Sequence, residues 1–141
     1  MTETNAGVTD AGKNGARADR DPDRPIGVAV LGMGNVGTEV VRILREHADD
    51  LRSRVGAPVV LRGVAVRNTV GRGIPEELLT TDADALVARE DVDLVVEVIG
   101  GIDPPRRLIL AALNAGKSVV TANKALLADY TGELAAAAER N

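Results

Sequence analysis

The chain has 141 residues, of which 45% are hydrophobic, and this length and composition suit one globular domain. It contains no cysteine and one histidine, which excludes disulfides, thiolate catalysis and metal sites built from cysteine and histidine. The net charge is −4 and one residue is aromatic, so we expect no nucleic-acid partner, and we also expect no metal. The chain has neither a membrane-length apolar run nor an apolar signal core, so we expect a cytoplasmic protein with no membrane partner.

Residues 1–25 differ in composition from the rest of the chain. They are rich in Thr, Asn, Gly, Asp and Arg and hold almost no apolar residues. Such a segment cannot bury enough apolar surface to offset its ordering entropy. The sequence therefore predicts a disordered tail over residues 1–25 and one folded domain over residues 26–141.

The first predicted strand, residues 26–31, leads directly into a glycine motif, Gly32-x-Gly34-x-x-Gly37. An amphipathic segment follows and predicts one helix over residues 35–55. In a dinucleotide-binding unit the first glycine allows a tight turn, the second lets the backbone approach a pyrophosphate, and the third lets helix and strand pack closely. Free N–H groups at the helix N-terminus then attract the phosphates. Glycines also mark ordinary turns, so the motif alone leaves that alternative open.

Strands and helices alternate through the rest of the chain. The predicted elements are a strand at 59–66, a helical turn at 75–79, a short helix at 81–89, a strand at 93–101, a helix opened by Pro104 and Pro105 and closed by Gly116, a strand at 118–121 and a helix at 131–141. This alternation favours an α/β fold, a Rossmann-type doubly wound parallel sheet. In such sheets the ligand lies at the carboxyl ends of the strands.

Arg67 follows the second long strand, at the position that recognises the ribose of a dinucleotide. An acidic residue there would bind the 2′-hydroxyl of NAD, but this chain has Arg67 and Asn68, with Arg72 close behind. A guanidinium pairs well with the 2′-phosphate of NADP. The pattern favours NADP over NAD, against the alternative that these arginines belong to an ordinary surface loop.

Lys124 comes just after the strand at 118–121, and the chain has only two other lysines, Lys13 and Lys117. An ammonium group exchanges its proton near neutral pH when its surroundings shift its pKa, whereas a guanidinium does not. Lys124 is therefore a candidate for proton transfer with a hydroxyl or carbonyl substrate. The alternative is a solvent-exposed loop lysine.

The strand predicted at 93–101 also carries special residues at its carboxyl end. These are Glu97, Ile99, Gly100 and Gly101. Glycines at this position let a cofactor lie close to the backbone. For Glu97 the sequence favours a satisfied structural carboxylate over a catalytic one. His47 lies on the polar side of the first helix, and we expect it to be solvated and not catalytic.

Four segments together resemble the N-terminal part of homoserine dehydrogenase. They are Gly-x-Gly-x-Val-Gly at 32–37, Val-Arg-Asn at 66–68, Val-Val-Glu-Val-Ile-Gly-Gly at 95–101 and Val-Thr-Ala-Asn-Lys-Ala-Leu at 120–126. The resemblance covers residues 26–141 and implies NAD(P)-dependent interconversion of L-homoserine and L-aspartate 4-semialdehyde, on the route to threonine and methionine. It implies that Gly34, Asn35 and Val36 contact the pyrophosphate, that Arg67 sets NADP preference, that Thr121 and Asn123 lie near the nicotinamide, and that Lys124 matches a lysine invoked in catalysis. The candidate cofactor-binding residues are thus Gly32, Gly34, Asn35, Val36, Gly37, Arg67, Ile99, Gly100, Thr121, Asn123 and Lys124, and the candidate catalytic residue is Lys124.

The family pattern extends beyond this chain. The resemblance implies a following substrate and dimerisation domain with a second lysine, acidic substrate ligands and a monovalent cation site, and a homo-oligomeric full-length enzyme. We therefore expect the 141 residues to be the cofactor-binding part of a longer enzyme and to be inactive alone. Two alternatives stay open, another NAD(P)-dependent amino-acid or semialdehyde dehydrogenase and an NADP-binding module without catalysis.

Overall fold

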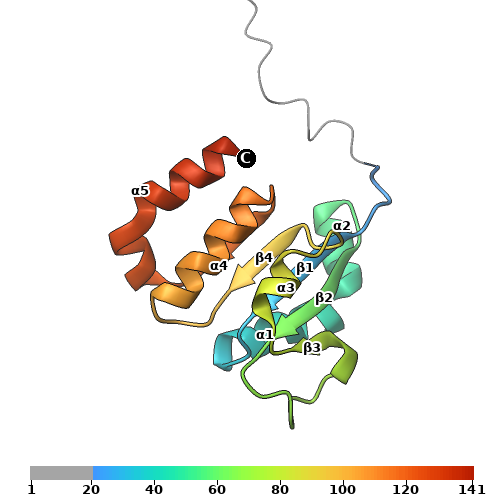
Figure 1. Cartoon of the computed structure of the whole chain (residues 1–141). Coiled ribbons are helices and arrows are strands. Elements are labelled where there is room, and N and C mark those ends of the chain that lie inside the picture. Colours follow the sequence, from blue (N-terminus) through green and yellow to red (C-terminus); the bar gives the residue numbers. More distant parts are fainter. Residues whose placement is uncertain (1–20) are drawn as a thin grey trace, which may run out of the picture.

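The computed structural model describes residues 21–141, which form a five-stranded parallel sheet with helices on both faces (Figure 1). The strand order is β3-β2-β1-β4-β5, with β1 (Ile26–Leu31), β2 (Val59–Ala65), β3 (Leu79–Thr80), β4 (Leu94–Glu97) and β5 (Ser118–Thr121). The helices are α1 (Asn35–Glu46), α2 (Ala48–Val55), α3 (Ala83–Val87), α4 (Asp103–Asn114) and α5 (Lys124–Arg140), with a 3-10 turn, η1 (Glu76–Leu78). The predicted Rossmann-type α/β fold is confirmed. Within residues 21–141 no helix is both long and apolar enough to cross a membrane.

β1 lies at the centre of the sheet, between β2 and β4. Successive side chains of a strand point to opposite faces. Val28 and Val30 therefore face one layer of helices, Ala29 and Leu31 face the other, and all four are buried. The continuous apolar run of β1 is what a strand covered on both faces requires.

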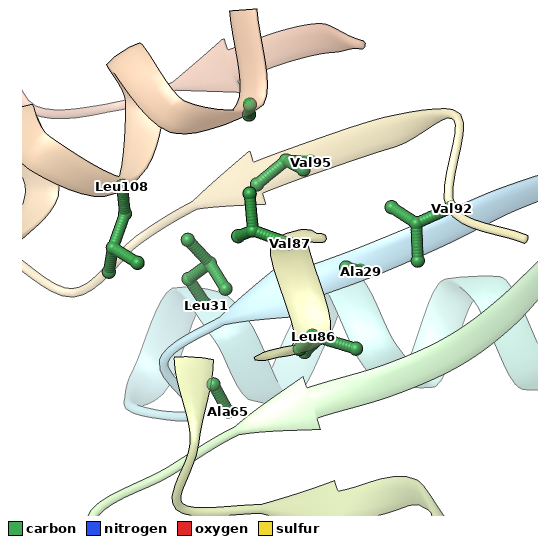
Figure 2. Packing of buried hydrophobic residues seen from close by; sticks show 9 residues of the cluster. Ala29, Leu31, Ala65, Leu86, Val87, Val92, Val95 and Leu108 are labelled. Atoms are coloured by element: carbon green, nitrogen blue, oxygen red, sulfur yellow. The ribbon is translucent and has the colours of Figure 1, made fainter. Parts of the chain in front are cut away.

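One face of the sheet is covered by α3 and α4. Figure 2 shows Leu86 and Val87 of α3 packed with Ala29 and Leu31 of β1. A Cβ added to Gly63 in β2 would lie 2.6 Å from Leu86 Cδ1, so Leu86 packs directly on this glycine and would have to shift for a larger residue there. This cluster buries the short helix that connects β3 to β4.

The other face is covered by α1 and α2, which the sequence predicted as one helix over residues 35–55. The prediction is wrong at His47, where φ is −112° and ψ is 30°, so α1 ends and α2 begins there. Two aspartates in the first turn of α2 favour this new start through the helix dipole. Burial also differs between the two helices, because Val41 of α1 is buried whereas Val55 of α2 is 51% exposed. His47 is exposed, as expected.

The final helix is longer than the sequence predicted, since α5 begins at Lys124 and not at residue 131. The sequence did not predict the N-terminal cap of this helix, in which Asn123 Oδ1 accepts a hydrogen bond from the backbone N–H of Leu126 at 3.1 Å. α5 packs against α4 on the outside of the molecule, around Ile109 and Leu126 (Figure 1). The strand β3 was not predicted either, because its two residues carry no periodic signal.

One predicted helix end is confirmed, and the short helix predicted at 81–89 is observed as the shorter α3, residues 83–87. Asp82 caps α3, with Oδ1 accepting a hydrogen bond from the N–H of Ala85 at 2.9 Å. Gly116 follows α4 with a φ of 77°, the left-handed conformation that closes many helices. Local capping chemistry therefore sets these two ends.

The predicted tail, residues 1–25, lies outside the described residues except for residues 21–25. Within this short stretch Arg24 forms an ion pair with Asp93 at 3.3 Å. The other carboxylate oxygen of Asp93 accepts a hydrogen bond from the N–H of Gly27 at 2.8 Å. These contacts join the chain to the sheet just before and within β1.

Candidate dinucleotide-binding site

The candidate residues follow four neighbouring strands at the same edge of the sheet. β1 leads into the glycine motif, β2 into Arg67, β4 into residues 98–101 and β5 into residues 122–124. The four strands run parallel, so their carboxyl ends meet at one edge. We call this the carboxyl edge, and along it the segments lie in the order β2-β1-β4-β5.

Two glycines of the motif are needed by the protein's own packing. Gly32 has a φ of 99°, and a Cβ there would lie 3.0 Å from the carbonyl oxygen of Val98. A Cβ on Gly37 would lie 2.2 Å from the carbonyl oxygen of Gly32, which is closer than side chains approach backbone atoms. These positions agree with the tight turn and the close helix packing that the motif predicted.

Gly34 differs because the fold itself does not require a glycine there. Its φ is −78°, a value that every residue type adopts, and an added Cβ would meet no atom within 4 Å. The missing side chain leaves open space in front of the first turn of α1. A pyrophosphate approaching the backbone is the reason the motif offers for that space.

The N-terminus of α1 borders this space and carries no side-chain cap. The N-termini of α3 and α5 are capped by Asp82 and Asn123. Those of α2 and α4 also lack a side-chain cap, but each carries acidic side chains in its first turn. The first turn of α1 holds no acidic residue, so its N–H groups and the positive end of the helix dipole face an incoming anion without competition. Val36 in the same turn is 57% exposed, which leaves an apolar side chain on the surface of the candidate site.

Arg67 and Arg72 behave differently in the loop after β2, a distinction that the sequence did not reveal. Arg72 donates from Nε to the carbonyl oxygen of Asn68 at 2.7 Å and from Nη1 to that of Met33 at 3.5 Å. Thr38 Oγ1 donates to the same Met33 carbonyl at 3.3 Å, so Arg72 links this loop to the glycine motif. Arg67 is exposed and has no hydrogen bond or ion pair with the described part of the chain. It is therefore the arginine that an anion meets without competition.

A hollow of about 390 Å³ lies between this loop and the side of α1. Its lining includes Met33, Arg45 and Arg72 but neither Gly34 nor Arg67. The hollow reaches the glycine motif at Met33 and Thr38, which lie on either side of Gly34 in the chain.

A chain of hydrogen bonds joins the ends of β4 and β5. Glu97 is 0% exposed, and its Oε1 accepts from the N–H of Ile99 at 2.8 Å while its Oε2 accepts from Thr121 Oγ1 at 2.5 Å. Thr121 Oγ1 in turn accepts from the N–H of Asn123 at 3.1 Å, and Asn123 Nδ2 donates to the carbonyl oxygen of Gly101 at 2.6 Å. The interpretation of Glu97 as a satisfied carboxylate agrees with these contacts. The hydrogen bond between Glu97 and Thr121 was not predicted. The sequence feature that could have indicated such a bond is a single acidic residue within an apolar strand.

The glycine pair after β4 lies in a turn, because the strand ends at Glu97 and does not extend to residue 101 as predicted. Gly100 and Gly101 have φ values of 84° and 80°. This left-handed conformation by itself explains both glycines. An added Cβ at either residue would meet no atom within 4 Å, so the turn presents an open backbone surface beside Thr121 and Asn123.

Lys124 is the first residue of α5 rather than a loop residue. It is exposed and forms no hydrogen bond or ion pair with residues 21–141. A cation gains nothing from the positive end of a helix dipole, and the first turn of α5 holds no acidic residue to offset it. The lysine at this position therefore has no stabilising role in the fold.

A family model described as the NAD binding domain of homoserine dehydrogenase matches residues 32–141. The chain belongs to the homoserine dehydrogenase family. It is 67% identical over 118 residues to the homoserine dehydrogenase of Mycobacterium tuberculosis, and 53% identical over 134 residues to that of Corynebacterium glutamicum. These matches cover 83% and 94% of this chain, but only 27% and 30% of the two relatives.

A solved homoserine dehydrogenase from Thiobacillus denitrificans shares the fold, with a TM-score of 0.74 and 40% identity. The likeness covers 82% of this chain and 27% of that structure. The resemblance based on four motifs is thus confirmed over the whole domain. The chain corresponds to the NAD-binding domain of proteins more than three times the length of the matched segment.

Proposed function

We propose that this chain binds NADPH along the carboxyl edge, as the cofactor-binding part of an enzyme that interconverts L-homoserine and L-aspartate 4-semialdehyde. The observation that carries the proposal is Gly34, which combines an unstrained backbone, open space and an uncapped helix N-terminus. Packing explains Gly32 and Gly37 but leaves Gly34 unexplained. A phosphate group at that position supplies the missing reason.

The residues of the carboxyl edge fit a dinucleotide. The backbone of Gly34, Asn35 and Val36 would hold the pyrophosphate at the start of α1. Arg67 would pair with the 2′-phosphate, because it has no competing partner in the described chain and a guanidinium matches phosphate geometry. On the other side of β1 the nicotinamide would be bordered by residues after β4 and at the end of β5: Ile99, Gly100, Thr121, Asn123 and Lys124.

The preference for NADP over NAD depends on Arg67. No carboxylate stands at the end of β2 to accept hydrogen bonds from an unmodified ribose. Arg72 is already bonded to two carbonyl oxygens, so Arg67 is the side chain that would distinguish the two cofactors.

Lys124 would act on the oxygen of the substrate. A bound nicotinamide cofactor supplies hydride exchange with the substrate carbon. During homoserine oxidation the hydroxyl loses a proton while its carbon loses a hydride, and Lys124 in its neutral amine form would take up that proton and become an ammonium group. In the reverse direction it would polarise the aldehyde oxygen and return a proton to it. The ammonium group of Lys124 has no partner within residues 21–141 and lies at the positive end of α5. Both features would stabilise negative charge on the substrate oxygen.

In this proposal residues 26–141 bind the cofactor and supply Lys124 for proton transfer. Further parts of a longer protein bind the substrate. This division is supported by the length of the relatives, because the region matched by this chain is only 27% of the mycobacterial protein. The amino and carboxylate groups of homoserine must be held before the reacting atoms reach a productive geometry. We further propose that the longer enzyme is a cytoplasmic homo-oligomer, as expected for this family of biosynthetic enzymes.

Two assays on the purified 141-residue chain test this function. Titration with NADPH and NADH, followed by nicotinamide fluorescence, should show saturable binding with NADPH the tighter ligand. Homoserine oxidation with NADP on the same sample should stay near background. Absence of saturable binding would contradict the cofactor assignment, and clear homoserine-dependent NADPH formation would contradict the division between cofactor and substrate parts.

A further inference from the structure

Glu97 is the buried charged residue of the described chain, with 0% of its surface exposed. It follows three apolar residues of β4, Leu94, Val95 and Val96. Within residues 21–141 no lysine or arginine pairs with it. Burying a carboxyl group is costly unless hydrogen bonds replace its hydration. The two hydrogen bonds that Glu97 accepts are therefore the reason this residue is tolerated in the strand.

These hydrogen bonds join two separate parts of the carboxyl edge. One oxygen holds the N–H of Ile99 at 2.8 Å and so fixes the turn after β4. The other holds the hydroxyl of Thr121 at 2.5 Å and so fixes the last residue of β5. A carboxylate only accepts hydrogen bonds, so the proton of the Thr121 hydroxyl points toward Glu97. The N–H of Asn123 donates to the same hydroxyl oxygen, which uses one of its two lone pairs and leaves the other as an acceptor of fixed direction.

The position of this pair along the carboxyl edge indicates which part of a dinucleotide it meets. The glycine motif after β1 marks the pyrophosphate, and Arg67 after β2 marks the adenosine side. The strand order β2-β1-β4-β5 then leaves the ends of β4 and β5 for the opposite half of the molecule. Glu97 and Thr121 join those two strand ends.

We propose that Glu97 is a positioning residue for the nicotinamide half of the cofactor. It acts by locking the Thr121 hydroxyl and the turn after β4 into one rigid surface. This inference rests on the proposed function, since it presupposes that a dinucleotide binds at the carboxyl edge. Glu97 itself is buried, so it acts through Thr121 and Ile99 and not by direct contact.

Replacing Glu97 by glutamine is a suitable perturbation because it keeps the shape of the side chain. The amide oxygen can still accept from Ile99, but the amide nitrogen must donate to Thr121 Oγ1. The hydroxyl proton of Thr121 is then forced to point elsewhere. The variant changes the surface beside the nicotinamide while leaving the glycine motif and Arg67 as they are.

The test compares two ligands that share the adenosine half. NADPH carries the nicotinamide, whereas adenosine 2′,5′-bisphosphate lacks it. Calorimetric titration of the 141-residue chain should show NADPH weakened by up to about tenfold by Glu97→Gln, the size expected for one misdirected hydrogen bond. Binding of adenosine 2′,5′-bisphosphate should stay within about twofold of the unmodified chain. Thr121→Val should reproduce the NADPH-specific loss, Thr121→Ser should retain binding, and Glu139→Gln at the far end of α5 is the charge-matched control.

Each outcome decides between the alternatives. Equal weakening of both ligands by Glu97→Gln would show a general structural role and overturn the inference, as would unchanged binding of both. If Glu97→Gln does not fold, as judged by circular dichroism, Thr121→Val against Thr121→Ser gives the same comparison. Failure of the unmodified chain to bind NADPH would overturn the proposed function itself. Binding by the unmodified chain with no effect of these variants would overturn only the role of Glu97.

Discussion

Replacing Gly34 by valine separates the two reasons for which the motif contains glycine. The backbone at Gly34 has a φ of −78° and an added Cβ meets no atom within 4 Å, so the folded protein accommodates the larger residue. The cost is a poorer residue at the helix N-cap, about 1 kcal/mol or less. Gly34→Val should therefore melt close to the unmodified chain.

Cofactor binding should respond much more strongly to Gly34→Val. A valine side chain would occupy the space through which the pyrophosphate reaches the N–H groups of α1. Losing two charge-assisted hydrogen bonds, at about 1.5 kcal/mol or more each, corresponds to a weakening of at least about 100-fold. Calorimetric titration with NADPH measures this loss, and thermal unfolding by circular dichroism measures the stability.

Two further glycines provide controls for Gly34→Val. Gly132 in α5 also has open surroundings, so Gly132→Val should leave both NADPH binding and folding unchanged. Gly37→Ala should instead lower the melting temperature, because its Cβ would lie 2.2 Å from the carbonyl oxygen of Gly32. The reasoning is refuted if Gly34→Val binds NADPH within about threefold of the unmodified chain.

Three other predictions follow from single side chains. Arg67→Ala should weaken NADPH by about 1–3 kcal/mol and leave NADH unchanged in parallel titrations, and equal losses for both cofactors would show that Arg67 does not select the phosphate. In a longer enzyme that contains this domain, Lys124→Ala should lower kcat far more than cofactor affinity, and an unchanged kcat would remove Lys124 from the mechanism. Arg106 holds the pKa of Glu133 below its ordinary value through a hydrogen bond and its charge. A lowered folded-state pKa means that this contribution is present at neutral pH and is lost as the pH falls below about 4. Glu133→Gln should therefore lose less stability than the unmodified chain between neutral and acid pH in thermal melts, and identical pH profiles would contradict this.

The fold could be predicted from the sequence where the signal was local and repeated. The run Ile26–Leu31 and the glycines after it specify a buried strand and a turn, and both are confirmed. The break at His47 was missed because the apolar residues on both sides still match a helical spacing. The early start of α5 was missed because the helix was predicted from the Ala-rich segment after residue 131, whereas its start depends on the cap formed by the Asn123 side chain.

The sequence predicted that the candidate segments share one edge of the sheet, but it did not predict the contacts between them. Strand alternation was enough to bring the segments after β1, β2, β4 and β5 to one edge. The contact between Glu97 and Thr121 joins residues that are distant in the chain, and no sequence spacing encodes it. The difference between Arg67 and Arg72 likewise depends on which carbonyl oxygens the folded loop presents.

The most direct test of the central claim is to map NADPH onto the chain by amide chemical shifts. At 14.7 kDa the protein suits heteronuclear NMR. NADPH should shift the amides of residues 34–37, 67–68, 99–101 and 121–124. Amides around the hollow of about 770 Å³ at the opposite end of the strands, lined by Glu90, Lys117 and their neighbours, should not change. Shifts confined to that hollow, or no saturable shifts at the carboxyl edge, would contradict the account.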